Sequence, residues 1–159
     1  MTPSKSLTNG IELIEDYFQF LFRDGFQIVD RYDQLAFGNW IVVLGSEKGL
    51  VRFIQDREEI SVRMAPPWAS TSIDQSQHYI DLSLLVNFLN KTETISLSTR
   101  KSLRMTDQFE SLRSKLHAHY SEIISLLTSD NFLATEDEIK IFQRRQIEKA
   151  FPHIKFRKD

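Results

Sequence analysis

The sequence predicts an α+β protein in which an antiparallel β-meander of three or four strands packs against an N-terminal helix and a C-terminal helical hairpin. Three observations favour this fold. β-rich runs alternate with short polar turns between positions 39 and 65, and apolar residues recur at helical spacing both before and after that segment. The 159-residue chain has the usual length of one domain, so we expect a single domain over 1–159, with an α+β part at about 8–90 and the helical hairpin at about 99–151.

The N-terminal helix is expected to begin at Thr8 or Asn9 and to end at Asp24, because Gly25 supplies a C-terminal stop. Its apolar residues recur on one face, which we expect to lie in the core. That face carries Ile11, Ile14, Phe18, Leu21 and Phe22. The next segment, 26–32, alternates imperfectly between apolar and polar residues and is interpreted as a short fourth strand.

The meander over 39–65 contains a pair of arginines whose placement can be predicted. If Arg57-Glu58 form a two-residue hairpin loop, Arg52 lies directly opposite Arg63. Like charges at directly opposite positions are unfavourable in a sheet unless an anion or a carboxylate lies between them. The pair is therefore the most unusual feature of the predicted sheet.

The register of the preceding strand decides which of its residues share a face of the sheet with these arginines. A turn flanked by Gly45 and Gly49 would place Val42 beside Arg52. The predicted core face then consists of Ile41, Val43, Val51, Phe53, Ile60, Val62 and Met64. The opposite face would carry Trp40, Val42, Leu44, Ile54, Arg52 and Arg63.

Two interpretations of this arginine-bearing face remain open. In the structural one, a helix partly covers it, and the arginines extend to solvent or pair with Asp or Glu from another segment. In the functional one, Trp40, Arg52 and Arg63 anchor an acidic protein partner, because Trp and Arg are enriched at binding hot spots and a guanidinium binds a carboxylate bidentately.

The second half of the chain is predicted to be mainly helical. Pro66-Pro67 ends the last strand, because proline cannot donate to a ladder, and the polar stretch 69–78 is a predicted loop. Asp81 is the expected N-cap of a short helix. The apolar residues of that helix are Leu82, Leu85, Val86 and Leu89.

Two longer helices are expected to follow as an antiparallel hairpin. The first covers about 99–128 and carries an apolar stripe. The stripe consists of Met105, Phe109, Leu112, Leu116, Tyr120, Ile123 and Leu127. The second opens with a predicted capping box, Thr135 to Glu138, and runs to Ala150, before Pro152. The long stripe could cover the sheet or form a dimer, so the oligomeric state stays open.

Motifs for catalysis, metal or cofactor binding are not found in the sequence. The chain has no cysteine, which excludes disulfides and thiolate chemistry. His117 and His119 point about 200° apart on a helix, and His119 with Glu122 would supply two metal ligands without a third. The five glycines form neither a Walker nor a dinucleotide-binding pattern. We therefore predict no catalytic residues, no metal and no cofactor.

The charge distribution of the chain bears on nucleic-acid binding, and its hydropathy bears on membrane contact. Residues 1–99 carry 8 Lys/Arg and 13 Asp/Glu, whereas 100–159 carry 12 and 9. The overall net charge of −2 makes nucleic-acid binding a weak alternative, restricted to the basic C-terminal segment. No apolar run is long enough to span a membrane and residues 1–10 are polar, so a cytoplasmic location without membrane contact is expected.

Several short motifs between about residues 11 and 90 resemble a known group of proteins. They are Phe37-Gly-Asn39, Leu50-Val-Arg-Phe53, Asp56-Arg57, Ala65-Pro66-Pro67, Tyr79-Ile-Asp-Leu82 and Phe88-Leu89. The series is similar to small uncharacterised bacterial α+β proteins, some of which look similar to immunity proteins of polymorphic toxin systems. The resemblance carries over no functional residue, and the helical part after Ser98 has no counterpart in it.

The resemblance implies a cytoplasmic protein that acts by binding another protein. In an immunity role, it would occlude a toxin's active site or hold the toxin inactive. We therefore expect a non-enzymatic protein-binding module, immunity-like or regulatory, in a bacterial system. The alternative is a small-ligand-binding regulatory domain, and an enzyme is the third choice.

Overall fold

The structure is a computed structural model that describes residues 2–92 and 104–153 of the chain. The helices are α1 (Lys5–Tyr17), α2 (Gln19–Arg23), the 3-10 helix η1 (Ala36–Gly38), α3 (Leu82–Asn90), α4 (Met105–Leu127) and α5 (Phe132–Ala150). The strands are β1 (Gln27–Tyr32), β2 (Trp40–Ser46), β3 (Gly49–Asp56), β4 (Glu59–Ala65) and β5 (Ile80–Asp81). The expected α+β class is confirmed.

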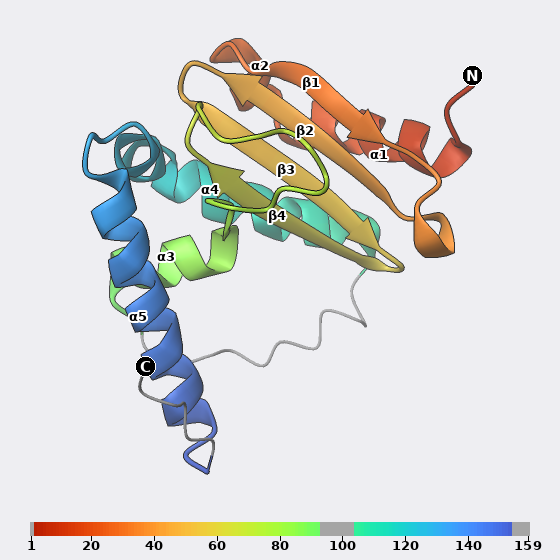
Figure 1. Ribbon diagram of the computed structural model, residues 1–159. Coiled ribbons are helices and arrows are strands. Elements are labelled where there is room, and N and C mark those ends of the chain that lie inside the picture. Colours follow the sequence, from red (N-terminus) through yellow and green to blue (C-terminus); the bar gives the residue numbers. More distant parts are fainter. Residues whose placement is uncertain (1, 93–103, 154–159) are drawn as a thin grey trace.

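The strands form one antiparallel sheet in the order β1-β2-β3-β4-β5. The meander is confirmed, the segment interpreted as a fourth strand is β1, and β5 is a further short strand that was not predicted. α1 and α4 lie behind the sheet in Figure 1, while the segment between β4 and β5 crosses its front. The two faces of the sheet are therefore covered by different kinds of structure.

The predicted register is correct for β3 and β4 but wrong for β2. Arg52 lies opposite Arg63, as expected, but it pairs on its other side with Val43 instead of Val42. The reason is the turn, because Ser46 pairs with Gly49 and leaves only two residues between the strands. A shift of one residue exchanges the two faces of a strand.

The face covered by helices holds the main core. Because of the one-residue shift, Trp40, Val42 and Leu44 belong to this core, whereas they were expected on the opposite face. Trp40 packs so closely on α1 that a Cβ added at Gly10 would lie 2.2 Å from the indole Cζ2. Gly10 is thus the position at which helix and sheet approach each other most tightly among the described glycines.

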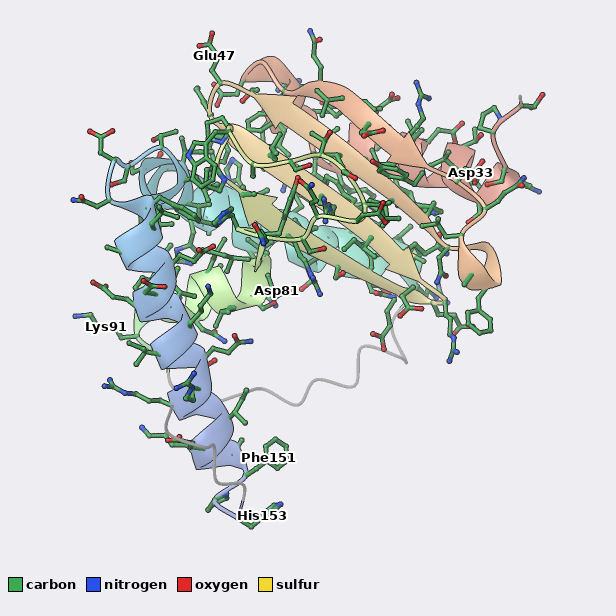
Figure 2. The ribbon with its side chains drawn as sticks, in the orientation of Figure 1. Asp33, Glu47, Asp81, Lys91, Phe151 and His153 are labelled. Carbon is green, nitrogen blue, oxygen red and sulfur yellow. The ribbon has the colours of Figure 1, made fainter. Side chains whose placement is uncertain are left out.

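The N-terminal helical segment begins earlier than expected and is interrupted. Ser4 is the N-cap of α1, since its hydroxyl oxygen accepts a hydrogen bond from the Leu7 N–H at 3.1 Å. The Ser4 N–H itself donates to Asp33 Oδ2 at 2.6 Å, and Asp33 lies beside the N-terminal segment in Figure 2. The helix then breaks at Phe18, whose side chain is fully buried, before α2 begins.

The expected Asp81 cap of α3 and the apolar stripe of α4 are confirmed, whereas α4 begins at Met105, after Arg104 in extended conformation. Asp81 caps α3, because its Oδ1 accepts from the backbone N–H of Ser83 and of Leu84 at 2.9 and 3.4 Å. The predicted stripe of α4 packs on the main core, and the predicted start of this helix, 99–103, lies outside the described residues. α4 also carries Gln108, which is 3% exposed.

Gln108 satisfies the free edge of β4. The Ile60 N–H donates to Gln108 Oε1 at 2.9 Å, and Gln108 Nε2 donates to the Glu58 carbonyl at 2.8 Å. β5 pairs only with Arg63 and Met64, so it does not reach this part of β4. Here a side-chain amide forms the hydrogen bonds with the backbone that a neighbouring strand forms elsewhere in the sheet.

The final helix differs from its prediction in two respects. α5 begins at Phe132, so Thr135 lies inside the helix, where its Oγ1 donates to the Asn131 carbonyl, and the predicted capping box is wrong. α5 also turns away from α4 instead of lying antiparallel along it (Figure 1). Its partner is α3, through Phe88 and Phe142, whose ring centroids are 5.7 Å apart. The prediction of an antiparallel hairpin of α4 and α5 is therefore wrong.

The front face of the sheet is covered by the segment 66–79, which contains the correctly predicted loop 69–78. It lies over a small second core that consists of Ile41, Val43, Leu50 and Ala65, with Ala69, Ile73 and Tyr79 packed against it. Among the described residues, no helix is long and apolar enough to cross a membrane.

Candidate functional surface

The structure separates the three residues that were predicted to form one partner-binding surface. Trp40 is 1% exposed and lies in the main core, on the face opposite to the two arginines. Arg52 is 2% exposed beneath the loop, whereas Arg63 is exposed. The expectation of a shared face is therefore wrong for Trp40, and a direct role of any of the three in partner binding stays a prediction.

Arg52 holds the segment 66–79 onto the sheet. Its Nη2 donates to the carbonyls of Ser72 and Gln75 at 3.1 and 3.2 Å, and its Nη1 donates to Ser76 Oγ at 3.4 Å. The guanidinium carbon lies 3.7 Å from the centroid of the Tyr79 ring. Burial raises the pKa of the Tyr79 hydroxyl. Arg52 thus has a structural role, but a loop covers it instead of the expected helix, and carbonyl and hydroxyl oxygens bind it instead of Asp or Glu.

The segment 66–79 exposes one large apolar side chain, that of Trp68. Its side chain is 57% exposed, and so is that of Leu133 at the beginning of α5. Both line an open hollow of about 480 Å³, here called the Trp68 hollow. Its walls consist of Glu47, Pro67, Trp68, Leu127, Thr128, Ser129, Asp130, Phe132 and Leu133. Large apolar side chains exposed together in a concave place are typical of binding surfaces.

Trp68 is held in place although it is exposed. Its ring packs edge-on against His78 and Phe132, with centroid separations of 4.8 and 5.9 Å. His78 is in turn fixed by Glu136, because Nδ1 lies 3.0 and 3.1 Å from the two carboxylate oxygens. Glu136 is 7% exposed on α5. The indole is therefore presented in a defined orientation, which lowers the entropy cost of using it in binding.

The backbone at His78 adds to this rigidity. Its φ is +71°, a left-handed conformation that residues other than glycine seldom adopt. Such a conformation costs free energy and persists only where surrounding contacts hold it. The His78 contacts with Glu136 and Trp68 are the contacts that can do so here.

The charged residues that line the Trp68 hollow are acidic. Glu47 belongs to the turn between β2 and β3, and Asp130 precedes α5; both are exposed. Figure 2 shows Glu47 projecting from the end of the sheet, beyond the turn. An acidic rim around an apolar centre favours a partner surface that carries an apolar residue flanked by Lys or Arg.

The histidines that were considered as metal ligands lie elsewhere. His119 Nδ1 is 3.8 Å from Glu122 Oε1, so these two residues do share one helix face, as predicted. His117 packs edge-on against Phe20, with ring centroids 5.2 Å apart. Within residues 2–92 and 104–153, no group of three His, Asp or Glu residues is arranged to hold a metal ion.

Sequence reasoning did not single out Trp68 or Leu133. They are far apart in the chain, and they meet only because the loop returns across the sheet towards α5. The one available indication was a tryptophan directly after Pro66-Pro67 in an otherwise polar stretch, where a core position is not expected.

Comparison with protein-family models gives no match, and searches of curated proteins and of solved structures give none either. The function of this chain must therefore be inferred from its own geometry.

Proposed function

We propose that this protein is a protein-binding module that acts without catalysis and docks its partner at the Trp68 hollow. The observation that carries this proposal is the pair of large apolar side chains, Trp68 and Leu133, each 57% exposed and both lining one hollow. Tryptophan is among the residues most enriched at binding hot spots, and a held indole contributes contact area with little loss of side-chain freedom.

The chemistry of the hollow favours one kind of partner. Glu47 and Asp130 would pair with Lys or Arg on the partner, while Trp68 offers an aromatic face to a cation and apolar area to a side chain between them. The occupant that we propose is therefore a protein segment with an apolar anchor between basic residues. Acidic residues around the anchor would also accelerate the encounter with a cationic partner at low salt.

An immunity-like role in the bacterial cytoplasm is the particular form that the sequence resemblance suggests. A protein that neutralises a toxin needs a rigid, complementary surface more than a reactive centre. The fixed orientation of Trp68 between His78 and Phe132 supports such a role, since a rigid anchor favours slow dissociation.

The proposal can be tested by affinity co-purification of the tagged protein from its native cells. We expect a stoichiometric partner with the wild-type chain and loss of that partner with a Trp68→Ser, Leu133→Ser variant. The matched control is Phe37→Ser, because Phe37 is 78% exposed but lies beside Arg57, at the opposite end of β3 from Glu47. This control should retain the partner.

A second variant tests the proposed chemistry of the partner. Glu47→Lys should weaken the purified complex by about tenfold, measured by isothermal titration calorimetry at low salt, and the difference should shrink as salt rises. If the partner binds Trp68→Ser, Leu133→Ser as tightly as wild type, or binds Glu47→Lys more tightly, the proposed surface is wrong. If no partner is recovered, the binding-module proposal fails in those cells.

A further inference from the structure

A second cavity is lined by residues of β5 and α5 and by His78. Its volume is about 610 Å³, within the usual range for small-molecule sites. The residues that decide its chemistry are Arg63, His78, Tyr79, Asp81, Glu136 and Lys140. Figure 2 shows Asp81 at the sheet end of α3, which marks the position of this cavity.

The two carboxylates of the cavity are already engaged within the protein. Asp81 Oδ1 accepts hydrogen bonds from the first turn of α3. Glu136 contacts His78 Nδ1 through both oxygens and lies 3.8 Å from Lys140 Nζ. Negative charge in the cavity is thus already compensated by protein groups, which makes a cationic ligand an unfavourable occupant.

The two cationic side chains of the cavity, in contrast, can still form hydrogen bonds with a ligand. The Arg63 side chain is exposed and makes no hydrogen bond or ion pair with another residue in the described part of the chain. The Lys140 side chain is 66% exposed, and its contact with Glu136 is longer than a hydrogen bond. Arg63 comes from β4 and Lys140 from α5, so positive charge lines the cavity from two different elements.

His78 adds a third polar group. Contact with both oxygens of Glu136 favours the proton on Nδ1, which leaves Nε2 as the nitrogen available to a ligand. Within the described residues, Nε2 has no hydrogen-bond partner. Ile80, Leu84 and Ile139 supply apolar area beside these polar groups.

We propose that this cavity binds a small organic anion, with its carboxylate or phosphate held by Arg63 and Lys140 and its short carbon skeleton on the apolar wall. A guanidinium binds either anion bidentately, so the shared chemistry is that of a compact oxyanion. This site is independent of docking at the Trp68 hollow, because Arg63 and Lys140 do not line that hollow.

The test is an NMR titration of the isotope-labelled full chain with succinate and, separately, with inorganic phosphate, at constant ionic strength set by sodium chloride. We expect saturable shifts of the backbone amides of Arg63, Ile80 and Gln143 with at least one of the two probes. Succinate alone would identify a carboxylate ligand, phosphate alone a phosphate ligand, and both outcomes support the site.

Variants locate the site and control for general charge effects. Arg63→Gln should weaken binding by about tenfold or more, as expected for loss of a charge-assisted hydrogen bond. Arg145→Gln removes the same charge from an exposed position of α5 that does not line the cavity, and it should bind like wild type.

The proposal is overturned by any of three results. These are no saturation with either probe up to about 50 mM, the weak end of specific binding; saturable shifts that map away from the cavity; or equal weakening by Arg63→Gln and Arg145→Gln. The last result would mean that the probes respond only to the overall charge of the protein. Arg63 is exposed, and its side chain forms no hydrogen bond or ion pair within the described residues, so the Arg63→Gln chain should fold normally.

Discussion

The two faces of the sheet are covered in different ways. One face contributes most of the stability, and the other carries the side chains that we propose to be functional. Behind the sheet, α1 and α4 bury a large apolar core. In front of it, a loop without regular structure covers a few apolar residues and is held by the hydrogen bonds of one buried arginine, Arg52. The apolar face supplies most of the stability, since burial of apolar area is the dominant favourable contribution to folding. The loop face positions the side chains that we propose to be functional.

The largest expected effect comes from a matched pair of substitutions that compares the two faces directly. Val42 and Val43 are adjacent in β2, both are fully buried, and they point to opposite faces. We expect Val42→Ala to lower the free energy of unfolding by about 2–3 kcal/mol and Val43→Ala by about 1–2 kcal/mol, because a loop can collapse into the space and packed helices cannot.

Urea denaturation of the two variants, followed by circular dichroism, measures this difference. Equal losses of stability would show that the loop packs as rigidly as the helices, and the contrast between the faces would then disappear.

A smaller global effect is expected from removal of the arginine that holds the loop. Arg52→Met keeps an unbranched, flexible side chain but leaves the carbonyls of Ser72 and Gln75 without their donor. We expect a loss of about 1–2 kcal/mol. Amide hydrogen exchange should become at least tenfold faster over 69–79 and stay unchanged in α1 and α4.

Arg63→Met is the control for Arg52→Met, because Arg63 is exposed on the same face and lies directly opposite in the sheet. Its stability should stay within about 0.5 kcal/mol of wild type. Uniformly faster exchange across the whole chain in Arg52→Met would contradict a role limited to the loop.

The smallest effect concerns a carboxylate on the helix-covered side. Asp24 Oδ1 lies 2.6 Å from Lys48 Nζ, and its Oδ2 accepts a hydrogen bond from the Tyr120 hydroxyl. The bonds from Lys48 and from Tyr120 hold the pKa of Asp24 below its ordinary value. A lowered pKa in the folded state stabilises the protein above the unfolded-state pKa, near 3.9, and this stabilisation is lost as pH falls through the folded-state pKa.

Asp24→Asn should therefore lower stability at pH 7 by less than about 1 kcal/mol, since the pair is partly exposed and screened by solvent. The difference from wild type should shrink as pH falls through the lowered folded-state pKa of Asp24. Urea denaturation across this pH range measures it, with Glu148→Gln as a control for loss of one exposed negative charge. A difference that stays constant from pH 7 to pH 3 would assign the effect to packing instead.

The fold was predictable where periodicity and capping decide local structure. The stripe of α4 follows helical spacing, and Asp81 has the side chain that an N-cap requires. The register of β2 was not predictable in the same way. Residues 40–44 are all apolar and all buried, so alternation cannot indicate which face each residue occupies, and the length of the turn at Glu47-Lys48 alone decides it.

The candidate surface was less predictable than the fold. The opposition of Arg52 and Arg63 followed from the two-residue loop, and the structure bears it out. The burial of Arg52 and the exposure of Arg63 could not be predicted from the turn, because both depend on where the loop 66–79 crosses the sheet. Trp68 and Leu133 meet only after α5 has packed on α3, a long-range arrangement that local patterns do not encode.

The amide of Gln108 binds two backbone groups at one border of the sheet, and the strand at the opposite border is interrupted. In β1 the pairing shifts between Ile28 and Asp30, which leaves Val29 as a bulge. Uninterrupted strand edges invite the addition of strands from other molecules, and bulges or covering groups prevent it. A strand from a second molecule would have to displace Gln108 from β4 or straighten the bulge in β1. Both borders of the sheet are thus less accessible to an added strand than uninterrupted strand edges would be.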